Sequence, residues 1–290
     1  MYRKILVPLS NAAFGMAAAL EAAIHIGQMF GSQVEVLYAR PSPEALILVL
    51  GKGFAGTMLE NALREVQAKI GRDCDAARER MQRICGQTGS PAAEDAASGL
   101  CPAVVWHEVE GPADRMAGIA GRFADLIVFG KPESGDMTDS VWRSMFDAAL
   151  FASARPVILM PSSSIPRIGS KIMIAWNGSP QATRAVAAAL PLLRQAQSVF
   201  IGTAGLDEDL QTDAGRLRDY LLIHGVDAQV EHLPKSLRET GGVLLGLAAQ
   251  FEADLLVLGG HGRNRLREWT LGSTTSHVAA LATIPVFLVH

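Results

Sequence analysis

The sequence predicts an α/β protein built from two tandem copies of one Rossmann-like fold, each with a doubly wound, mostly parallel five-stranded sheet. Three observations predict it: a length of 290 residues, an internal repeat, and segments that alternate between strand-like and helix-like patterns. At about 150 residues per domain, the length indicates two domains. A composition of 49% hydrophobic and 19% charged residues excludes a disordered chain.

The repeat is clearest in two pairs of segments that lie 129 positions apart. Residues 124–130 (ADLIVFG) resemble residues 253–259 (ADLLVLG), and residues 155–159 (RPVIL) resemble residues 284–288 (IPVFL). A constant spacing between two matching pairs indicates that one structural unit occurs twice.

Near the start of each copy the spacing is different. Residues 4–8 (KILVP) resemble residues 171–175 (KIMIA), which lie 167 positions later, so the first copy contains about 38 extra residues. We expect these in its second loop and second helix. The predicted domains are residues 1–161 and residues 168–290, joined by the Pro- and Ser-rich segment 161–166 (PSSSIP).

The second copy alternates between apolar runs of strand length and helical patterns. Its first helix has Ser179 as the expected N-cap and Pro180 in the first turn. We predict strands at 171–175, 198–203, 228–232, 254–258 and 284–289, and helices at 180–194, 207–224, 237–251 and 272–281. The first copy follows the same order, with a long second helix whose apolar residues recur at steps of three and four from Leu59 to Ile84.

Charge and cysteine content exclude several classes of protein. A formal net charge of −3 argues against nucleic-acid or membrane-surface binding. We see neither a signal peptide nor an apolar run of membrane-spanning length. The three cysteines, Cys74, Cys85 and Cys101, have no metal or redox spacing. We therefore expect a cytoplasmic protein with reduced, buried thiols.

The loop after the fourth strand of the second copy carries the most informative pattern. Gly259 and Gly262 allow a tight turn and a close approach of the backbone to a ligand. Gly272-Ser273-Thr274 then opens a helix, where free N–H groups favour an anion. The residues alone leave two readings open: a cradle for phosphate, or glycines that serve turns and a serine that caps a helix.

The pattern Gly259-x-x-Gly262-(nine residues)-Gly272-Ser273 resembles the G-2x-G-9x-G-(S/T) nucleotide loop of the universal stress protein family. The resemblance extends over both copies, as in a tandem universal stress protein. It implies an adenine nucleotide alpha hydrolase-like fold that binds ATP or a related adenine nucleotide. It also implies a regulatory role in the stress response and at most slow ATP hydrolysis. Mg²⁺ is the divalent ion expected if one accompanies the phosphates.

The same resemblance suggests three further nucleotide-binding positions. Ala175 and Asn177 lie in the family's opening strand and turn, where a proline and an aspartate are common. Asparagine keeps an acceptor oxygen but lacks the charge. The backbone that contacts adenine falls near Thr203. Two alternatives stay open for the side chains of His261 and of the arginines 263, 265 and 267. They contact the ligand, or they are solvated loop residues.

The first copy departs from this pattern. It keeps Gly130 and Ser144, but Glu133 and Arg143 stand where the second copy has Gly262 and Gly272, and Ser10 stands where the family has its aspartate. A carboxylate in a phosphate loop repels the ligand. We therefore predict a degenerate first copy that does not bind nucleotide.

A second glycine pattern, residues 51–56 (GKGFAG), matches the G-x-G-x-x-G pattern of dinucleotide sites. Such a site requires the pattern to follow a first strand, whereas strands are expected earlier at 3–8 and 33–39. A long helix follows where a second strand is needed. We therefore favour a loop here. A Walker-type P-loop pattern does not occur in the sequence.

Other functions and partners stay open at this level. A nucleotide-dependent hydrolase or transferase would show steady turnover, and a partner-binding scaffold would bind no nucleotide in either copy. No catalytic arrangement and no metal-binding pattern stands out. The resemblance further implies that the copies pair through residues 157–160 and 286–289, and that the tandem chain could form a homodimer.

Overall fold

The computed structural model describes residues 1–10, 15–50, 56–93, 102–132, 140–162, 168–204, 208–233, 240–260 and 273–290. The first half contains β1 (Lys4–Ser10), α1 (Met16–Phe30), β2 (Gln33–Arg40), α2 (Pro43–Leu50), α3 (Thr57–Thr88), β3 (Ala92–Ala93), β4 (Ala103–Glu110), α4 (Ala113–Gly121), β5 (Leu126–Gly130), α5 (Ser140–Asp147), a π-helical segment (Ala148–Ala152) and β6 (Val157–Met160). The second half contains β7 (Lys171–Trp176), α6 (Pro180–Leu193), β8 (Ser198–Ala204), α7 (Glu208–Ile223), β9 (Ala228–Leu233), α8 (Thr240–Gln250), β10 (Leu255–Gly259), α9 (Ser273–Leu281) and β11 (Val286–Val289).

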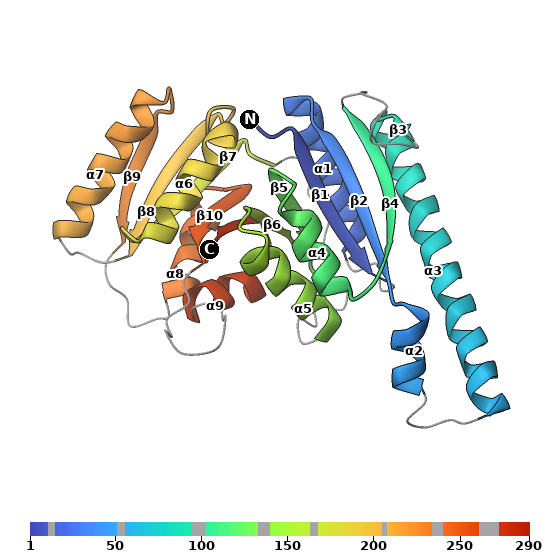
Figure 1. Cartoon of the computed structure of the whole chain (residues 1–290). Coiled ribbons are helices and arrows are strands. Elements are labelled where there is room, and N and C mark those ends of the chain that lie inside the picture. Colours follow the sequence, from blue (N-terminus) through green and yellow to red (C-terminus); the bar gives the residue numbers. More distant parts are fainter. Residues whose placement is uncertain are drawn as a thin grey trace.

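All of these strands belong to one sheet with the order β3-β4-β2-β1-β5-β6-β11-β10-β7-β8-β9. Neighbouring strands within each half are parallel, and β6 and β11 pair antiparallel where the halves meet. Figure 1 shows the halves side by side, with β6 and β11 between them. The predicted pairing of residues 157–160 with 286–289 is therefore confirmed. The two predicted five-stranded sheets are continuous, and the first half adds the two-residue strand β3.

Helices cover both faces of the sheet, as expected for parallel strands without polar alternation. The cluster on one face includes apolar residues of α1, α3, α6 and α7. The cluster on the other face includes residues of α4, α5, α8 and α9. Both clusters run across the junction, because β6 and β11 contribute side chains such as Ile158 and Phe287 to one and Leu159 and Leu288 to the other. The halves therefore share their cores.

The repeat is visible in the backbone hydrogen bonds. The amide of Lys131 donates to the carbonyl of Met160, and 129 positions later the amide of Gly260 donates to Val289. The carboxylate of Asp125 accepts from the amides of Arg3 and Lys4. Its counterpart Asp254 accepts from the amides of residues 169–171, although burial raises its pKa above the ordinary value. Both aspartates hold the start of a neighbouring strand, so their role is structural.

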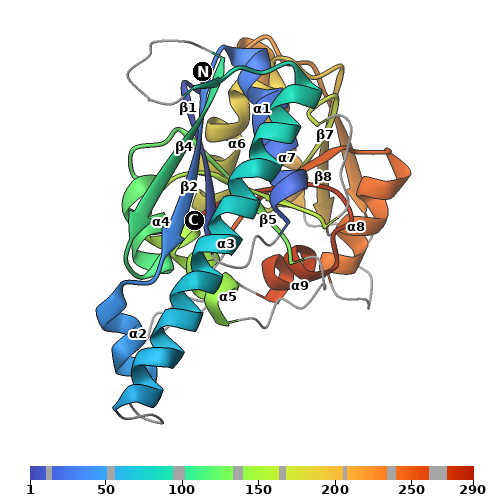
Figure 2. The same ribbon diagram turned by 90° about the vertical axis from the view of Figure 1, so that its right-hand side faces the viewer.

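The extra residues of the first half lie in the second loop and the second helix, as predicted. They lengthen α3 and also form α2, a helix that the sequence pattern did not indicate. The apolar stripe of α3 is buried from Ile70 to Ile84, whereas α2 and the first part of α3 pack on each other and project from the body (Figures 1 and 2). Residues 43–50 form a helix, so the G-x-G-x-x-G pattern does not follow a strand and a dinucleotide site is excluded there.

The prediction of buried thiols agrees with the structure for the two cysteines that it describes. Cys74 and Cys85 are free and buried, while Cys101 lies outside the described residues. Burial raises the pKa of the Cys74 thiol to about 11, so this cysteine is not an activated nucleophile. Within the described ranges, the helices are too short or too polar to cross a membrane.

Candidate functional site

The candidate site lies at the carboxyl ends of the strands in the second half. In the sheet, β7 has β8 on one side and β10 on the other. The chain runs from β7 to β8 and β9 on one side, then crosses back to β10 and β11 on the other. In open α/β sheets, ligands bind outside the carboxyl ends of the strands at such a reversal. The loops after β7 and β10 flank this switch point.

The strand register brings two of the predicted positions, Thr203 and Gly259, to the level of Trp176. Trp176, the last residue of β7, pairs with Thr203 of β8. Val257 of β10 pairs with Ile174, so Gly259 lies level with Trp176 on the other side. Thr203 is fully buried at this level, between β7 and β9. Residues far apart in the sequence therefore meet in one row.

The turn after β7 has the local geometry that its sequence predicts. The Oδ1 atom of Asn177 accepts the amide of Ser179 at 3.2 Å, which closes an Asx turn, and Gly178 has a φ of +69°. The Oγ atom of Ser179 accepts the amide of Ala182 at 3.1 Å, so Ser179 caps α6 with Pro180 in the first turn. Asn177 is exposed at the end of the strand, and its Nδ2 group can only donate.

Gly259 has a packing reason that the sequence alone does not reveal. A Cβ atom on Gly259 would lie 2.5 Å from the amide nitrogen of Ala182, because the end of β10 touches the first turn of α6. In the first half, a Cβ on Gly130 would lie within van der Waals overlap of the backbone of Gly15. The half that lacks the loop pattern keeps this glycine, so the glycine at this position serves helix–strand packing. It leaves the Gly259 carbonyl at the edge of the sheet.

The first turn of α9 is attached to this edge. The hydroxyl of Thr275, a buried residue, donates to the carbonyl of Gly259 at 3.2 Å. Ser273 is exposed and Thr274 is half-buried at the start of the helix. The first amides of a helix have no intrahelical acceptor and lie at the positive end of the helix dipole. Thr275, which the sequence analysis did not single out, thus fixes these amides beside the switch point.

Two buried polar atoms near this edge lack a partner among the described residues. One is the donor Nε1 of Trp176, at the end of β7, and the other is the acceptor Oε1 of Gln181, in the first turn of α6. Buried polar groups are normally hydrogen-bonded, so unpaired ones are expected where a ligand, a water molecule or a further segment completes the structure. From the sequence, the one signal for these unpaired atoms is the position of Trp176 next to the Asn177 turn.

The structure brings together six of the eight predicted site residues, namely Ala175, Asn177, Thr203, Gly259, Ser273 and Thr274. The side chain of Ala175 packs in the core. Gly262 and Gly272 lie outside the described residues, as do His261 and the three loop arginines. In the part of the chain that is described, no group of three or more His, Cys, Asp or Glu side chains could hold a metal ion.

The equivalent edge of the first half is filled by side chains. α5 begins at Ser140, so a helical turn occupies the positions that match residues 269–272 of the second half. The indole of Trp142, 1% exposed, donates to the carbonyl of Gly130 at 2.8 Å and stacks on Phe146. Tyr38 stands where the second half has Thr203, and it is fully buried against Trp106. Ser10 is also buried.

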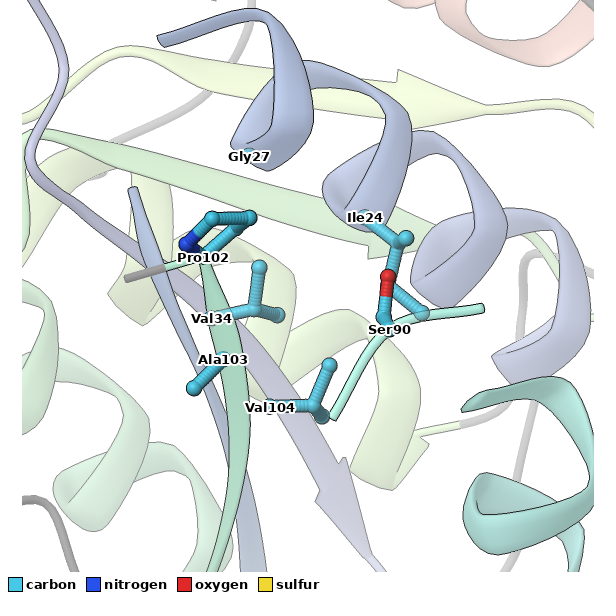
Figure 3. Close-up of a pocket in the computed structure, with 7 residues that line it drawn as sticks. All are labelled: Ile24, Gly27, Val34, Ser90, Pro102, Ala103 and Val104. Carbon is cyan, nitrogen blue, oxygen red and sulfur yellow. The ribbon is translucent and has the colours of Figure 1, made fainter. Parts of the chain in front are cut away.

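Two hollows lie away from these edges. Figure 3 shows one at the amino ends of β2 and β4, lined by Ile24, Gly27, Val34, Ser90, Pro102, Ala103 and Val104. It has no room for a water molecule. The other is a shallow hollow of about 150 Å³ between α3 and β4, lined by Arg78, Met81, Gln82, Ala92, Ala93 and Trp106. Neither lies at the carboxyl ends of the strands.

Comparison with known sequences connects the second half to a family. Residues 170–290 match the sequence model of the Universal stress protein family. A curated universal stress protein from Synechocystis sp. is 24% identical over 198 residues, which are 65% of this chain. The match spans 66% of that relative, slightly less than two thirds of its length.

Comparison with solved structures extends the likeness to the whole fold. A universal stress protein from Archaeoglobus fulgidus aligns over 99% of this chain and 97% of its own, with a TM-score of 0.69 at 15% identity. A protein of unknown function from Pseudomonas aeruginosa aligns over 99% of this chain and 92% of its own, with a TM-score of 0.58 at 17% identity. The second half of this chain therefore resembles the universal stress protein family in sequence, and the chain as a whole has the fold of the universal stress protein from Archaeoglobus fulgidus.

Proposed function

We propose that the second half binds ATP or a related adenine nucleotide at the switch point between β7 and β10. One observation carries the proposal: the Thr275 hydroxyl holds the first turn of α9 against the Gly259 carbonyl, beside the Asn177 turn. Members of the family whose sequence model this half matches bind adenine nucleotides. In this arrangement the amides of Ser273 and Thr274 face the phosphates. Gly262 and Gly272 complete the predicted loop.

The nucleoside then lies along the ends of β7 and β8. The main chain near Thr203 faces the adenine, and Asn177 faces the ribose. Trp176 Nε1 and Gln181 Oε1 supply a donor and an acceptor that the described residues leave unpaired. Trp176 ends β7 and Gln181 lies in the first turn of α6, so both groups lie beside the proposed site.

We further propose that the chain is regulatory, with little or no catalysis. A general base for ATP hydrolysis needs a carboxylate or imidazole at hydrogen-bond distance from the attacking water. None of the predicted site residues in the described part of the chain has such a side chain. Mg²⁺ could join through phosphate oxygens and water, since it keeps several waters in most nucleotide sites. A cytoplasmic location and a homodimer remain part of this proposal.

The first half does not bind nucleotide in this proposal. Trp142 and Phe146 fill the space beside Gly130, and Ser144 donates its hydroxyl to the carbonyl of Val141 within α5. Arg143, which stands in place of Gly272, pairs with Asp147 at 3.0 Å. We therefore expect one nucleotide per chain.

The test is a calorimetric titration with Mg²⁺-ATP of the wild type and of the matched variants Ser273→Asp and Ser144→Asp. A carboxylate in the first turn of α9 interacts favourably with the helix dipole, so Ser273→Asp should keep the fold. The same negative charge repels a phosphate group. At about 4 Å and an effective dielectric constant of about 20, this repulsion amounts to several kcal/mol. We expect at least a tenfold loss of affinity for Ser273→Asp and no change for Ser144→Asp.

Other results would contradict the proposal. A wild type that binds no ATP, or equal losses in both variants, would rule out the assigned site. Steady release of phosphate with an acceptor substrate would instead identify an enzyme. Mass spectrometry of ligands released from the denatured protein identifies the nucleotide.

A further inference from the structure

A lysine of the first half is buried against the helix that carries the candidate phosphate site of the second half. Lys131 follows β5 directly, and only 6% of its surface is exposed. Its Nζ atom donates to the carbonyl of Ala280 at 3.2 Å and to the carbonyl of Ala282 at 2.8 Å. These carbonyls lie at the end of α9, in the other half of the chain.

This contact supplies hydrogen-bond donors to the carbonyl groups at the carboxyl-terminal end of α9. The last carbonyls of a helix have no intrahelical donor, and they carry the negative end of the helix dipole. An ammonium group is a suitable partner for both reasons. Burial lowers the pKa of Lys131 to about 8, because the charged form is poorly hydrated there. The hydrogen bonds of this lysine therefore define where the end of α9 lies.

The second half has no equivalent of the Lys131 contact at the matching position. The position that matches Lys131 in the second half is Gly260, which has no side chain to extend toward the first half. In its place, His290 contacts the carbonyl of Gly260 through Nδ1 at 3.2 Å and packs its ring on Phe151 at 4.8 Å. The first half therefore holds a helix of the second half by a buried cation, and no matching cation is held in return at Gly260.

Both ends of α9 are thus fixed to other parts of the molecule. The helix has nine residues and spans about 13 Å at 1.5 Å per residue. Thr275 attaches its first turn to β10 within the second half, and Lys131 attaches its last turn to the first half. A shift at the Lys131 end is carried along so short a helix to the amides of Ser273 and Thr274.

We propose that Lys131 is a positioning residue for the nucleotide site: the half without a site holds α9 so that its first amides face the phosphates. This proposal rests on the proposed function. Its consequence is that nucleotide binding in the second half is coupled to the contact between the halves. The coupling is reciprocal, because a ligand that depends on the placement of α9 also stabilises that placement.

The test compares Lys131→Met with Phe151→Leu as a matched control, with adenosine and ATP as ligands. Methionine has a similar length but donates no hydrogen bond. Phe151, which is equivalent to Ala280 in the repeat, packs on His290 of the second half. Phe151→Leu therefore changes a contact between the halves and leaves Lys131 in place. We expect Lys131→Met to weaken ATP binding about tenfold and adenosine binding by less than twofold, since adenosine has no phosphate. Phe151→Leu should leave the affinity for both ligands unchanged.

The outcomes separate this proposal from the proposed function. If the wild type binds no ATP, both are wrong. If the wild type binds ATP and Lys131→Met binds it equally well, or loses ATP and adenosine alike, the positioning role of Lys131 is wrong and the proposed function stands.

Hydrogen exchange on the wild type gives a second test that needs no variant. Saturating ATP should slow amide exchange in residues 126–132 of the first half as well as in residues 273–282. Slower exchange in α9 without any effect on residues 126–132 would overturn the coupling.

Discussion

The equivalent glycine carbonyls at the ends of β5 and β10 accept hydrogen bonds from side chains of very different size. At the end of β5, the Gly130 carbonyl accepts the indole N–H of Trp142, whose ring fills the edge together with Phe146. At the end of β10, the Gly259 carbonyl accepts the small hydroxyl of Thr275. The strands and their register are otherwise equivalent. Equivalent edges of a duplicated fold can therefore carry a large buried ring in one half and a small hydroxyl in the other, without any change in the sheet.

The largest effect that tests this comparison is expected at Trp142. Trp142→Ala removes a fully buried ring and should lower the free energy of unfolding by about 3–5 kcal/mol. Trp142→Phe keeps the stack on Phe146 and loses the hydrogen bond to Gly130, so it should cost only about 1–2 kcal/mol. Urea unfolding measures both. The ATP affinity of Trp142→Phe should equal that of the wild type, and a loss there would show that the first half takes part in binding.

A smaller effect is expected from the pH dependence of stability at Lys131. Burial lowers the pKa of this lysine from 10.5 to about 8, so between these values the unfolded chain binds more protons than the folded one. Stability therefore rises with pH in this window. Relative to Lys131→Met, the wild type should gain on the order of 2 kcal/mol between pH 7 and pH 9.5.

The difference between the two proteins is the quantity to measure, because other groups titrate in the same range. Burial also raises the pKa of Tyr2, Tyr38, Cys74 and Cys85, which lowers stability at high pH in both proteins. These contributions cancel in the difference. A constant difference from pH 7 to pH 9.5 would show that Lys131 is not buried as a cation.

The smallest effect is expected at Thr275. Thr275→Val keeps the shape of the side chain and removes the bond to Gly259, which should destabilise the protein by about 1 kcal/mol. Because the first turn of α9 then loses its attachment, ATP affinity should fall several-fold. Thr275→Ser retains the hydroxyl and serves as the control. Equal ATP binding by the valine and serine variants would show that this hydrogen bond does not place the phosphate-binding amides.

Much of the fold could be predicted because the local sequence patterns for strands, helix caps and apolar helix faces agree with the elements of the folded protein. The apolar run at residues 254–258, the cap at Ser179 and the stripe from Leu59 to Ile84 each depend on neighbours within a few residues. The matching spacing of 129 positions then predicted both sheets, and the resemblance to the universal stress protein family implied the pairing of their last strands. The continuous sheet follows from that pairing, and only the two-residue strand β3 had no sequence pattern to indicate it.

The contacts of the site were less predictable because they join residues that are distant in sequence. Thr275 is an ordinary helical threonine until the structure places it beside Gly259. Gly259 has a packing role that the local sequence does not reveal, because the backbone of Ala182 excludes a side chain there. Lys131 is an unremarkable loop lysine in sequence, and its partners lie about 150 positions away. Such contacts arise from packing between repeats, which no periodicity encodes.

The antiparallel contact between β6 and β11 joins the two halves of a single chain, which are connected by the residues between Met160 and Lys171. Tethering of this kind gives the two edges an effective concentration in the millimolar range or above. Formation of the eleven-stranded sheet is therefore a first-order event that dilution does not reverse. Communication between the halves would then respond to the amount of ligand in the cell and be insensitive to the amount of protein.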